Sequence, residues 1–428
     1  MHKFLSAVIF IAFLSCFSTC KKTGDPKNSS SENSPLLPEG SGWEKVGTVK
    51  YTYTTVGFAN MNAMEPVELE KIGSQINILY SENYQLSGVI GRQFYKAKLN
   101  IGANNTAETT KISLPSGTDE QSGLCFQYLI PGAYEAMATS FLKNGQPTYL
   151  HIVNEQGQHI GNQFVGHPGR TASVYSNGDV LAGTIDYAEY AELDFYNKTS
   201  NTWTIIKGTS HDTTLLVGYT PFRLPDGSLK AFNITAKEKY GPDNKVYISI
   251  AHPAVNPVGQ QPLFTSEFLQ RIPEFETDFY ANAYPKIICS SQEENTFTVV
   301  IGTFPYNSQI VSKLFAYSWT PGSTNFKKLY GDVPVSEYIH DKLKSQNIRC
   351  RADGTVYFWD QSLDGKTGAL TTIDASGIYS AGKVTFTDEP ILIGAVKYLD
   401  GAYYAAVYPF TDQFDAKHNL RMDIVKLK

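Results

Sequence analysis

The sequence predicts an all-β protein built from about seven similar four-stranded units. The 428-residue chain carries 27 Tyr and 24 Phe. Its apolar stretches are short runs of aromatic and β-branched residues bounded by Gly, Asn, Asp and Pro, a pattern typical of strands. Helical periodicity is confined to short pieces near residues 263–271 and 335–345. In addition, one kind of turn recurs along the chain, and it defines the units.

The recurring turn is an Asn-Gly or Asp-Gly pair between two apolar runs. This is a strong hairpin signal because both residues tolerate positive φ. We expect Asp353-Gly354 to form a two-residue turn of this kind, and seven equivalent hairpins in all. The copies lie in residues 175–183, 224–232, 351–359 and 398–407, with Asn144-Gly145 as a fifth and with Glu294-Asn295 and Glu82-Asn83 as degenerate ones.

The spacing of these turns predicts a β-propeller. Asn83 and Asp400 are 317 residues apart, so the six intervals average about 53 residues, which suits one four-stranded blade per interval. Second hairpins follow in residues 191–208, 313–330 and 371–386. These two-hairpin units resemble kelch- or NHL-type blades, although they lack the kelch double glycine and no Trp-Asp dipeptide repeats among them. The single intervals of 33 and 68 residues would also suit two β-sandwich domains, which remain the alternative.

The two ends of the predicted domain complement each other. The last unit, which contains Asp400-Gly401, is one strand short, whereas residues 43–53 form a spare strand before the first unit. We expect residues 43–53 to pair with residues 419–428 and to close a ring of seven blades, which removes both free edges. Val46, Val49, Tyr51 and Tyr53 would then face neighbouring blades, with Met422, Ile424 and Leu427 as partner surface.

The first twenty residues indicate export. A short basic start precedes an uncharged apolar run from residue 4 to residue 17, followed by Ser18, Thr19, Cys20 and two lysines. This run is too short for a spanning helix and is typical of a secretory signal. The Cys-Lys-Lys ending resembles the lipoprotein signals of Gram-negative bacteria, especially of the Bacteroidetes type. The alternatives are Cys16 as the lipidated residue, or an ordinary cleaved signal.

The resemblance implies three parts. Residues 1–19 are a lipoprotein signal peptide, and residues 20–42 are a lipidated cysteine with a flexible tether rich in Ser, Asn, Pro and Gly. Residues 43–428 are a single propeller domain. The protein is then an outer-membrane lipoprotein on the periplasmic or cell-surface face, and the lipid on Cys20 makes the membrane a partner.

Charge and cysteine content argue against some classes of partner and bound group. The chain carries 36 basic and 41 acidic residues, a net charge of −5, without a basic stripe, which argues against nucleic acid. Cys125, Cys289 and Cys350 are widely spaced and form no CxxC pattern. A zinc site is therefore not expected, one disulfide is possible, and no metal or cofactor is predicted.

Several motifs for catalysis and metal binding are absent from the sequence: GxSxG, HExxH, a P-loop and a DxDxDG calcium loop do not occur. Two acidic groups and the histidines are interpreted as ordinary polar surface. These residues are Asp186, Glu189, Glu192 and Asp194, then Glu274, Glu276 and Asp278, and the histidines His151, His159, His167, His211, His252, His340 and His418.

Aromatic residues give the best candidates for binding. Trp203, Trp319 and Trp359 fall inside the units, where core packing is favoured. Loops on a rigid scaffold collect ligand contacts, and exposed rings stack on sugars or side chains. We therefore predict a propeller that binds a carbohydrate or protein ligand, without an assigned catalytic residue. The alternative is a glycoside hydrolase or lyase with carboxylates in the central funnel. The candidate ligand contacts are Tyr240, Tyr280, Tyr284, Tyr306 and Tyr338.

Overall fold

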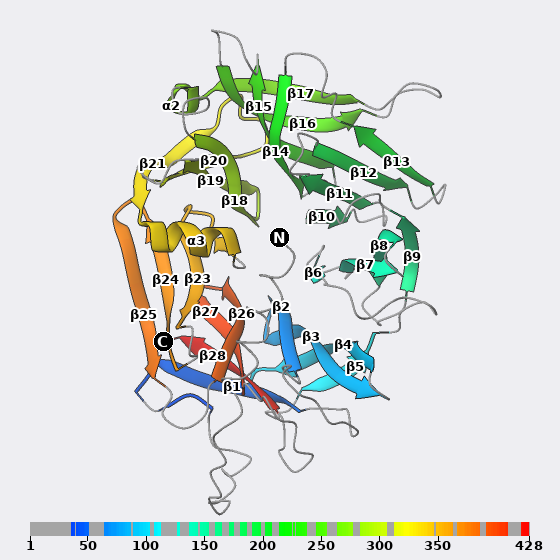
Figure 1. The fold of residues 1–428 in the computed structure, drawn as a ribbon, viewed down its shortest axis with the longest axis vertical. Helices are drawn as coiled ribbons and strands as arrows, with labels where there is room; N and C mark the ends of the chain where they lie inside the picture. Colours follow the sequence, from blue (N-terminus) through cyan, green and yellow to red (C-terminus); the bar gives the residue numbers. More distant parts are fainter. Residues whose placement is uncertain are drawn as a thin grey trace, which may run out of the picture. The chain divides into compact units, whose positions relative to one another are not determined.

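Seven antiparallel sheets of four strands each make up the described part of the computed structural model, within a unit that spans residues 36–428 (Figure 1). We number the sheets as blades 1 to 7 in chain order. The described residues are 36–38, 40–50, 64–86, 89–102, 107–112, 126–128, 137–143, 146–153, 159–164, 171–174, 180–185, 191–197, 202–207, 214–224, 226, 228–237, 245–254, 263–276, 283–305, 312–345, 348–362, 366–385, 391–409 and 421–427.

Blades 1 to 3 each use four consecutive strands that pair in chain order. Blade 1 contains β2 (Met64–Ile72), β3 (Gln75–Leu86), β4 (Val89–Asn100) and β5 (Glu108–Lys111). Blade 2 contains β6 (Phe126–Tyr128), β7 (Met137–Lys143), β8 (Gln146–Val153) and β9 (His159–Phe164). Blade 3 contains β10 (Thr171–Val174), β11 (Val180–Ile185), β12 (Ala191–Asn197) and β13 (Thr202–Lys207).

Blades 4 to 6 repeat this order. Blade 4 contains β14 (Thr214–Arg223), β15 (Leu229–Lys237), β16 (Lys245–Ala254) and β17 (Leu263–Arg271), and the one-turn helix α2 (Pro273–Glu276) follows it. Blade 5 contains β18 (Ala283–Glu293), β19 (Thr296–Pro305), β20 (Ser312–Trp319) and β21 (Lys327–Val335). After α3 (Glu337–Ser345), blade 6 contains β22 (Arg349–Cys350), β23 (Val356–Gln361), β24 (Thr367–Asp374) and β25 (Gly377–Thr385).

Blade 7 joins the two ends of the unit. Its order is β26 (Ile391–Leu399), β27 (Ala402–Pro409), β28 (Arg421–Leu427) and then β1 (Trp43–Lys50). β1 pairs antiparallel with β28 from Trp43 opposite Leu427 to Lys50 opposite Arg421. The predicted closure is therefore confirmed over the described residues, whereas Tyr51 and Tyr53 lie outside them.

The seven blades follow one another around a ring. The first strand of blade 1, β2, contacts both β6 of blade 2 and β26 of blade 7, and contacts also link β10 to β14, β14 to β18, and β18 to β22. Blades 6 and 7 meet through β23 and β26. The first strands thus line a common centre, as Figure 1 illustrates. This is a seven-bladed β-propeller, and the alternative of two β-sandwich domains is wrong.

The turns correct several details of the predicted repeat. Asp400 and Gly401 form the expected two-residue turn between Leu399 and Ala402, with φ of 46° and 81°. The loop at Gly354 is longer, because Arg351 and Thr355 pair by a backbone hydrogen bond of 2.9 Å from Arg351 N to Thr355 O. Gly354, at φ 86°, is thus the third residue of a three-residue loop.

Two predicted hairpins are not equivalent to the others. Glu82 and Asn83 lie inside β3, opposite Gln93 and Arg92 of β4, so the prediction of a turn there is wrong. The 144–145 pair joins the second and third strands of blade 2, whereas the 175–179 segment joins the first and second strands of blade 3. This difference accounts for the short interval of 33 residues.

Of the two predicted helical pieces, one is confirmed. Residues 337–345 form α3, and the Ser336 hydroxyl accepts the backbone N–H of Ile339 at 3.3 Å, as a helix N-cap does. Residues 263–271 form the outer strand β17 instead, which pairs with β16 along its length. Tertiary pairing in blade 4 therefore overrides the local pattern. Within the described ranges, no helix is long and apolar enough to cross a membrane.

The packed body begins earlier than predicted. Leu37 is buried in the apolar cluster between blades 6 and 7, and Leu36 packs against the same cluster. The Leu36 backbone N–H also donates to Asp423 Oδ2 at 3.1 Å. The predicted boundary at Trp43 is thus wrong, because the last part of the expected tether forms part of the core.

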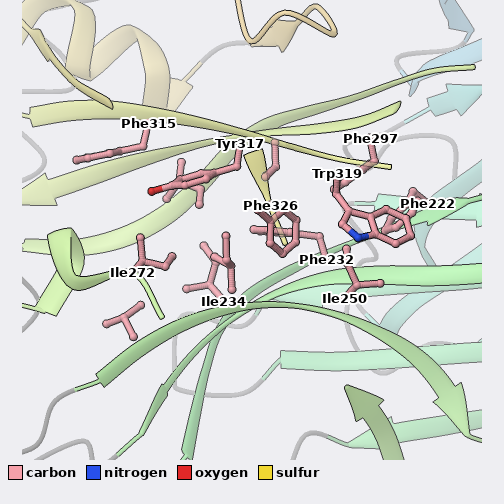
Figure 2. Close-up of a cluster of buried hydrophobic side chains, with 14 of the residues drawn as sticks. Phe222, Phe232, Ile234, Ile250, Ile272, Phe297, Phe315, Tyr317, Trp319 and Phe326 are labelled. Carbon is pink, nitrogen blue, oxygen red and sulfur yellow. The ribbon is translucent and has the colours of Figure 1, made fainter. Parts of the chain in front are cut away.

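Apolar side chains fill the spaces between blades. Figure 2 shows the cluster between blades 4 and 5, where Phe222 stacks on Phe297 with ring centroids 4.1 Å apart and Trp319 meets Phe222 edge-on at 5.7 Å. Similar clusters join blade 5 to 6, 6 to 7, and 7 to 1. Among the described residues, blades 5, 6 and 7 therefore contribute both faces of their sheets to the core.

Candidate functional site

A buried carboxylate lies between two cations at the centre of the ring. Glu68 Oε2 is 2.6 Å from Arg349 Nη2, and Glu68 Oε1 is 3.1 Å from Lys397 Nζ. The Glu68 side chain is 6% exposed, and those of Arg349 and Lys397 are about one-quarter exposed. We call these three residues the channel cluster.

The channel cluster joins the first strands of three consecutive blades. Glu68 lies on β2 of blade 1, Arg349 on β22 of blade 6 and Lys397 on β26 of blade 7. Blade 7 lies between blades 6 and 1 in the ring, so the Glu68–Arg349 ion pair joins two blades that are not neighbours. Glu68 and Lys397 each follow directly on a β-bulge. A bulge re-aims the side chains beside it. The two bulges therefore interrupt the regular alternation of side-chain directions at Glu68 and at Lys397.

The charges of the cluster stabilise one another. Burial alone would raise the pKa of Glu68, but the charges of Arg349 and Lys397 and their hydrogen bonds outweigh it and hold that pKa at about 2. The pKa of Arg349 is raised, because the pull of Glu68 and its hydrogen bond exceed the opposing effect of burial. Glu68 is therefore ionised at neutral pH, with both oxygens in ion pairs.

Glu70, two residues further along β2, behaves differently. Burial raises its pKa, although Asn77 Nδ2 of the neighbouring strand donates to Glu70 Oε2 at 3.2 Å. Glycoside cleavage requires two carboxyl groups that flank the scissile bond. Glu68 is held by its two cations, whereas Glu70 Oε2 accepts a hydrogen bond from the next strand and Glu70 Oε1 is buried without a hydrogen-bond partner.

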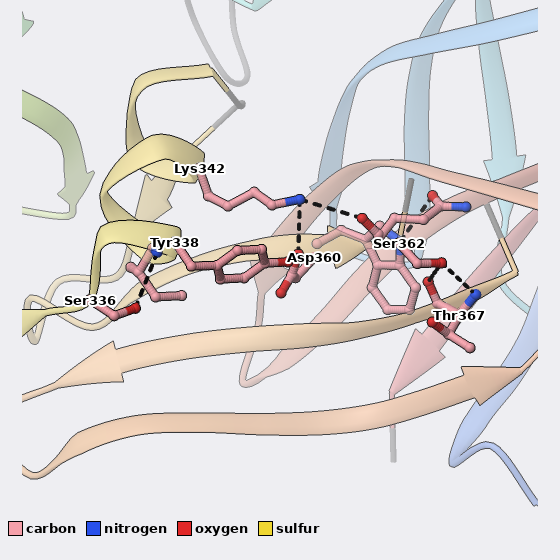
Figure 3. A network of polar contacts seen from close by, with 9 residues as sticks. Ser336, Tyr338, Lys342, Asp360, Ser362 and Thr367 are labelled. Atoms are coloured by element: carbon pink, nitrogen blue, oxygen red, sulfur yellow. Dashed lines mark hydrogen bonds and ion pairs between the residues drawn. The ribbon is translucent and has the colours of Figure 1, made fainter. Parts of the chain in front are cut away.

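A second arrangement lies on α3, where it meets β23 of blade 6 (Figure 3). The Tyr338 hydroxyl donates to Asp360 Oδ1 at 2.6 Å, and Lys342 Nζ lies 3.1 Å from the same oxygen. Lys342 Nζ is also 5.2 Å from the centroid of the Tyr338 ring. We call Tyr338, Lys342 and Asp360 the α3 platform.

The α3 platform presents an exposed aromatic ring in a fixed orientation. Tyr338 is 54% exposed, yet its hydroxyl is bound to a carboxylate that Lys342 also holds. The hydrogen bond to Asp360 raises the pKa of Tyr338, so the phenol stays protonated at neutral pH. A ring held in this way can stack on a sugar face or an apolar side chain with little loss of side-chain entropy.

The structure places the predicted contact tyrosines unevenly. Tyr338 is exposed on the platform, and Tyr284 lies in the first strand of blade 5, opposite Phe304. Tyr240, Tyr280 and Tyr306 lie outside the described residues, as do Cys16, Cys20 and Cys125. The predicted role of these residues stays a prediction. Trp319 and Trp359 are buried, which confirms their assignment to the core, and Trp203 lies in β13.

The acidic groups and histidines form no described centre. Glu274 in α2 pairs with Lys328 at 2.6 Å on the surface, and Glu192 and Asp194 lie in β12. Among the described residues, no group of three His, Cys, Asp or Glu side chains could hold a metal ion. His151, His159, His252 and His340 lie in β8, β9, β16 and α3, and the residues outside the described ranges are Asp186, Glu189, Asp278, His167, His211 and His418.

Sequence reasoning missed the channel cluster. The available signal was Glu68 and Glu70 alternating with Leu69 in a first strand, because first strands line the centre of a propeller. The pairing with Arg349 and Lys397 could not be read from the sequence, since it depends on the closure of the ring.

Comparisons with known proteins give fold likenesses only. No family model matches the chain, and no curated protein matches it. Among solved structures, a sialidase from Trypanosoma rangeli has a TM-score of 0.38 at 10% identity over 91% of this chain. The chain spans 60% of the length of that sialidase.

Two further structures are similar at the same level. The β-propeller domain of the Trilobed protease from Pyrococcus furiosus has a TM-score of 0.42 at 8% identity, over 85% of this chain and 97% of that one. An α-L-arabinanase from Penicillium chrysogenum has a TM-score of 0.32 at 11% identity, over 87% and 99%. Likenesses this distant carry no argument about activity, and the assignment of the fold rests on the seven sheets themselves.

Proposed function

We propose that this protein is an exported, lipid-anchored propeller that binds a carbohydrate through the face that carries α3. The observation that supports the proposal is the Tyr338 ring, which is exposed yet held by Asp360 and Lys342. An exposed tyrosine normally samples several rotamers, and ordering it on binding costs free energy. Here the ordering is already achieved in the free protein, as a binding site requires.

Binding is favoured over hydrolysis by the state of the central carboxylate. Glycoside cleavage needs two carboxyl groups that are free to reach the scissile bond, whereas Glu68 has a pKa of about 2 and both of its oxygens are held in ion pairs. The channel cluster fits a role in fixing the first strands of blades 1, 6 and 7. A rigid ring then supports the loops and the helix that contact the ligand.

Anchoring is proposed from the sequence around Cys20. Fifteen residues separate Cys20 from Leu36, where the packed body begins. At about 3.5 Å per residue, this segment could hold the propeller up to roughly 50 Å from a bilayer. In this proposal a lipid on Cys20 retains the protein at the outer membrane while the propeller reaches its ligand.

The binding site can be tested with two tyrosines. An array of neutral and anionic oligosaccharides, followed by titration calorimetry on the best probe, should show binding that Tyr338→Ala weakens at least 10-fold. Tyr379 is a matched control, because it is 49% exposed but lies on the outer strand of blade 6. Tyr379→Ala should bind as the parent does. Two outcomes would refute the assignment. The first is an equal affinity of the parent and both variants for the oligosaccharide, and the second is a parent that binds protein ligands but no oligosaccharide.

The anchor is tested independently of the ligand. Cys20→Ala should move the protein from the membrane to the soluble fraction, and Cys16→Ala should not. Loss of retention in Cys16→Ala alone would assign the lipid to the alternative cysteine. Retention in both variants would exclude a lipidated cysteine at either position.

A further inference from the structure

Two buried cysteines face each other across the boundary between blades 5 and 6. Cys289 lies on β18, directly after a β-bulge and opposite Val300. Cys350 is the last residue of β22 and lies opposite Val356. β18 and β22 are the contacting first strands of the two blades. The two thiols therefore approach each other from separate sheets.

The surroundings of the two thiols are apolar. Cys289 and Cys350 are 8% and 5% exposed, and both belong to the cluster that contains Val300, Ala316 and Val356. A hydrogen bond joins the two side chains. A disulfide requires the two sulfur atoms to approach each other directly, and the hydrogen bond between these side chains brings the two thiols together.

We propose that Cys289 and Cys350 form a disulfide that links blade 5 to blade 6 in the exported protein. The proposal rests on the export proposed above, since oxidising compartments maintain such bonds. The oxidant is the disulfide of a thiol–disulfide exchange partner. Each cysteine loses its S–H proton, one S–S bond forms between Cys289 and Cys350, and the partner's disulfide is reduced to two thiols.

The bond should form faster before the blades have packed than after. Burial raises the pKa of the Cys289 thiol well above its ordinary value, and the hydrogen bond to Cys350 adds to this effect. The thiolate is the attacking species, so the folded dithiol reacts slowly. For the same reason, a finished disulfide at this position is shielded from external reductants.

The link would reinforce a weak strand. β22 has two residues and pairs with β23 only at Arg349–Tyr357 and Cys350–Val356. Arg349, which holds Glu68 in the channel cluster, is the neighbour of Cys350. A covalent bond at Cys350 therefore fixes the strand that carries the arginine across the ring.

Peptide mapping tests the pairing. The full mature chain is unfolded, refolded in an oxidising glutathione buffer, unfolded again with N-ethylmaleimide, and digested without reductant. We expect a linked pair of peptides containing Cys289 and Cys350 whose mass is two hydrogens below the sum of the free peptides. The pair should persist in Cys125→Ser and disappear in Cys289→Ser and Cys350→Ser.

The results of peptide mapping distinguish failure of the proposed disulfide from failure of the proposed export. Alkylation of both Cys289 and Cys350 after oxidative refolding, or linkage of either one to Cys125, would overturn the proposed bond wherever the protein resides. A linked pair after refolding, with free thiols in protein isolated from cells, would support the pairing and contradict the proposed oxidising location. A bond that forms should also resist dithiothreitol until denaturant is added.

Discussion

The boundary between blades 4 and 5 and the closure of the ring at blade 7 are built differently. Between blades 4 and 5, buried aromatic rings such as Phe222 and Phe297 fill the space. At the closure, apolar packing is joined by buried charge. Asp423 is fully buried and lies 3.0 Å from Lys45 Nζ, and it accepts hydrogen bonds from the Thr48 hydroxyl and the Leu36 N–H.

The difference follows from the distance along the chain. Blades 4 and 5 are consecutive, so the chain itself keeps them side by side and non-directional packing suffices. β1 must find β28 from the other end of the unit. A one-residue slip of β1 along β28 would move Val49 to the opposite face of the sheet and would take Lys45 and Thr48 away from the buried Asp423. We infer that the buried charges at the closure select its register.

The largest effect is expected from opening the ring. Deletion of residues 36–50 removes β1, with the fully buried Val49 and the pairing partner of β28. The lost burial and ladder hydrogen bonds should lower the free energy of unfolding by more than about 5 kcal/mol, and the exposed edge should promote aggregation. Calorimetry and sedimentation measure both. Deletion of residues 21–35 is the control, and equal stability of the two variants would contradict the closure.

The apolar boundary should be sensitive to loss of volume. Phe297→Ala removes a ring that stacks on Phe222 and also approaches Phe232 at 6.0 Å. We expect a loss of about 4 kcal/mol in urea unfolding, typical of a buried Phe. The loss should be the same at pH 7 and pH 3, because no charge changes. A loss below 1 kcal/mol would mean that the blades do not depend on this stack.

The channel cluster should respond to pH. Glu68→Gln leaves Arg349 and Lys397 without their counter-charge, at an expected cost of about 3 kcal/mol at pH 7. The folded-state pKa of Glu68, about 2, lies below its ordinary value of 4.5. The stabilisation is therefore complete above about pH 4.5 and is lost as the pH falls toward 2. The difference between parent and variant should shrink over this window; a constant difference would contradict the ion-pair role.

The smallest effect concerns the segment before β1. Leu37→Ala should cost about 2 kcal/mol, at the low end for a buried leucine, because the segment lies at the rim of the domain. Leu37 is 6% exposed in the cluster between blades 6 and 7. Thermal unfolding of the full chain measures the loss. An unchanged midpoint of thermal unfolding would show that residues 36–42 belong to the flexible tether and not to the packed domain.

Local turn chemistry made much of the fold predictable. Asp400-Gly401 forms the expected turn, and the strand deficit of the last unit correctly predicted the pairing of β1 with β28. The prediction of a turn at Glu82-Asn83 was wrong, because a polar pair can also lie within a long strand when a neighbouring strand pairs with it, as β4 does here. The prediction of a helix at residues 263–271 was wrong, because pairing with β16 outweighed the helical spacing of their apolar side chains.

The candidate sites were predicted less completely. Tyr338 could be selected as a loop aromatic from the sequence, but its fixed orientation depends on Asp360, a residue 22 positions away on another element. The channel cluster joins residues separated by up to 329 positions, from Glu68 to Lys397. Contacts at such distances are set by the number of blades and the register of the closure, and neither quantity is encoded near the residues concerned.

The closure also dictates an order of events during synthesis. The Thr48 hydroxyl and its acceptor Asp423 are 375 residues apart, so at about 10 residues per second β1 waits roughly 40 seconds for its partner strand to be made. During that time β1 has an unpaired edge. Blades 1 to 6 can form as the chain enters the compartment where it folds, whereas blade 7 cannot be completed until β28 has arrived. The ring therefore acts as a check on the integrity of the chain, because a polypeptide that stops before Arg421 keeps an open edge at β1.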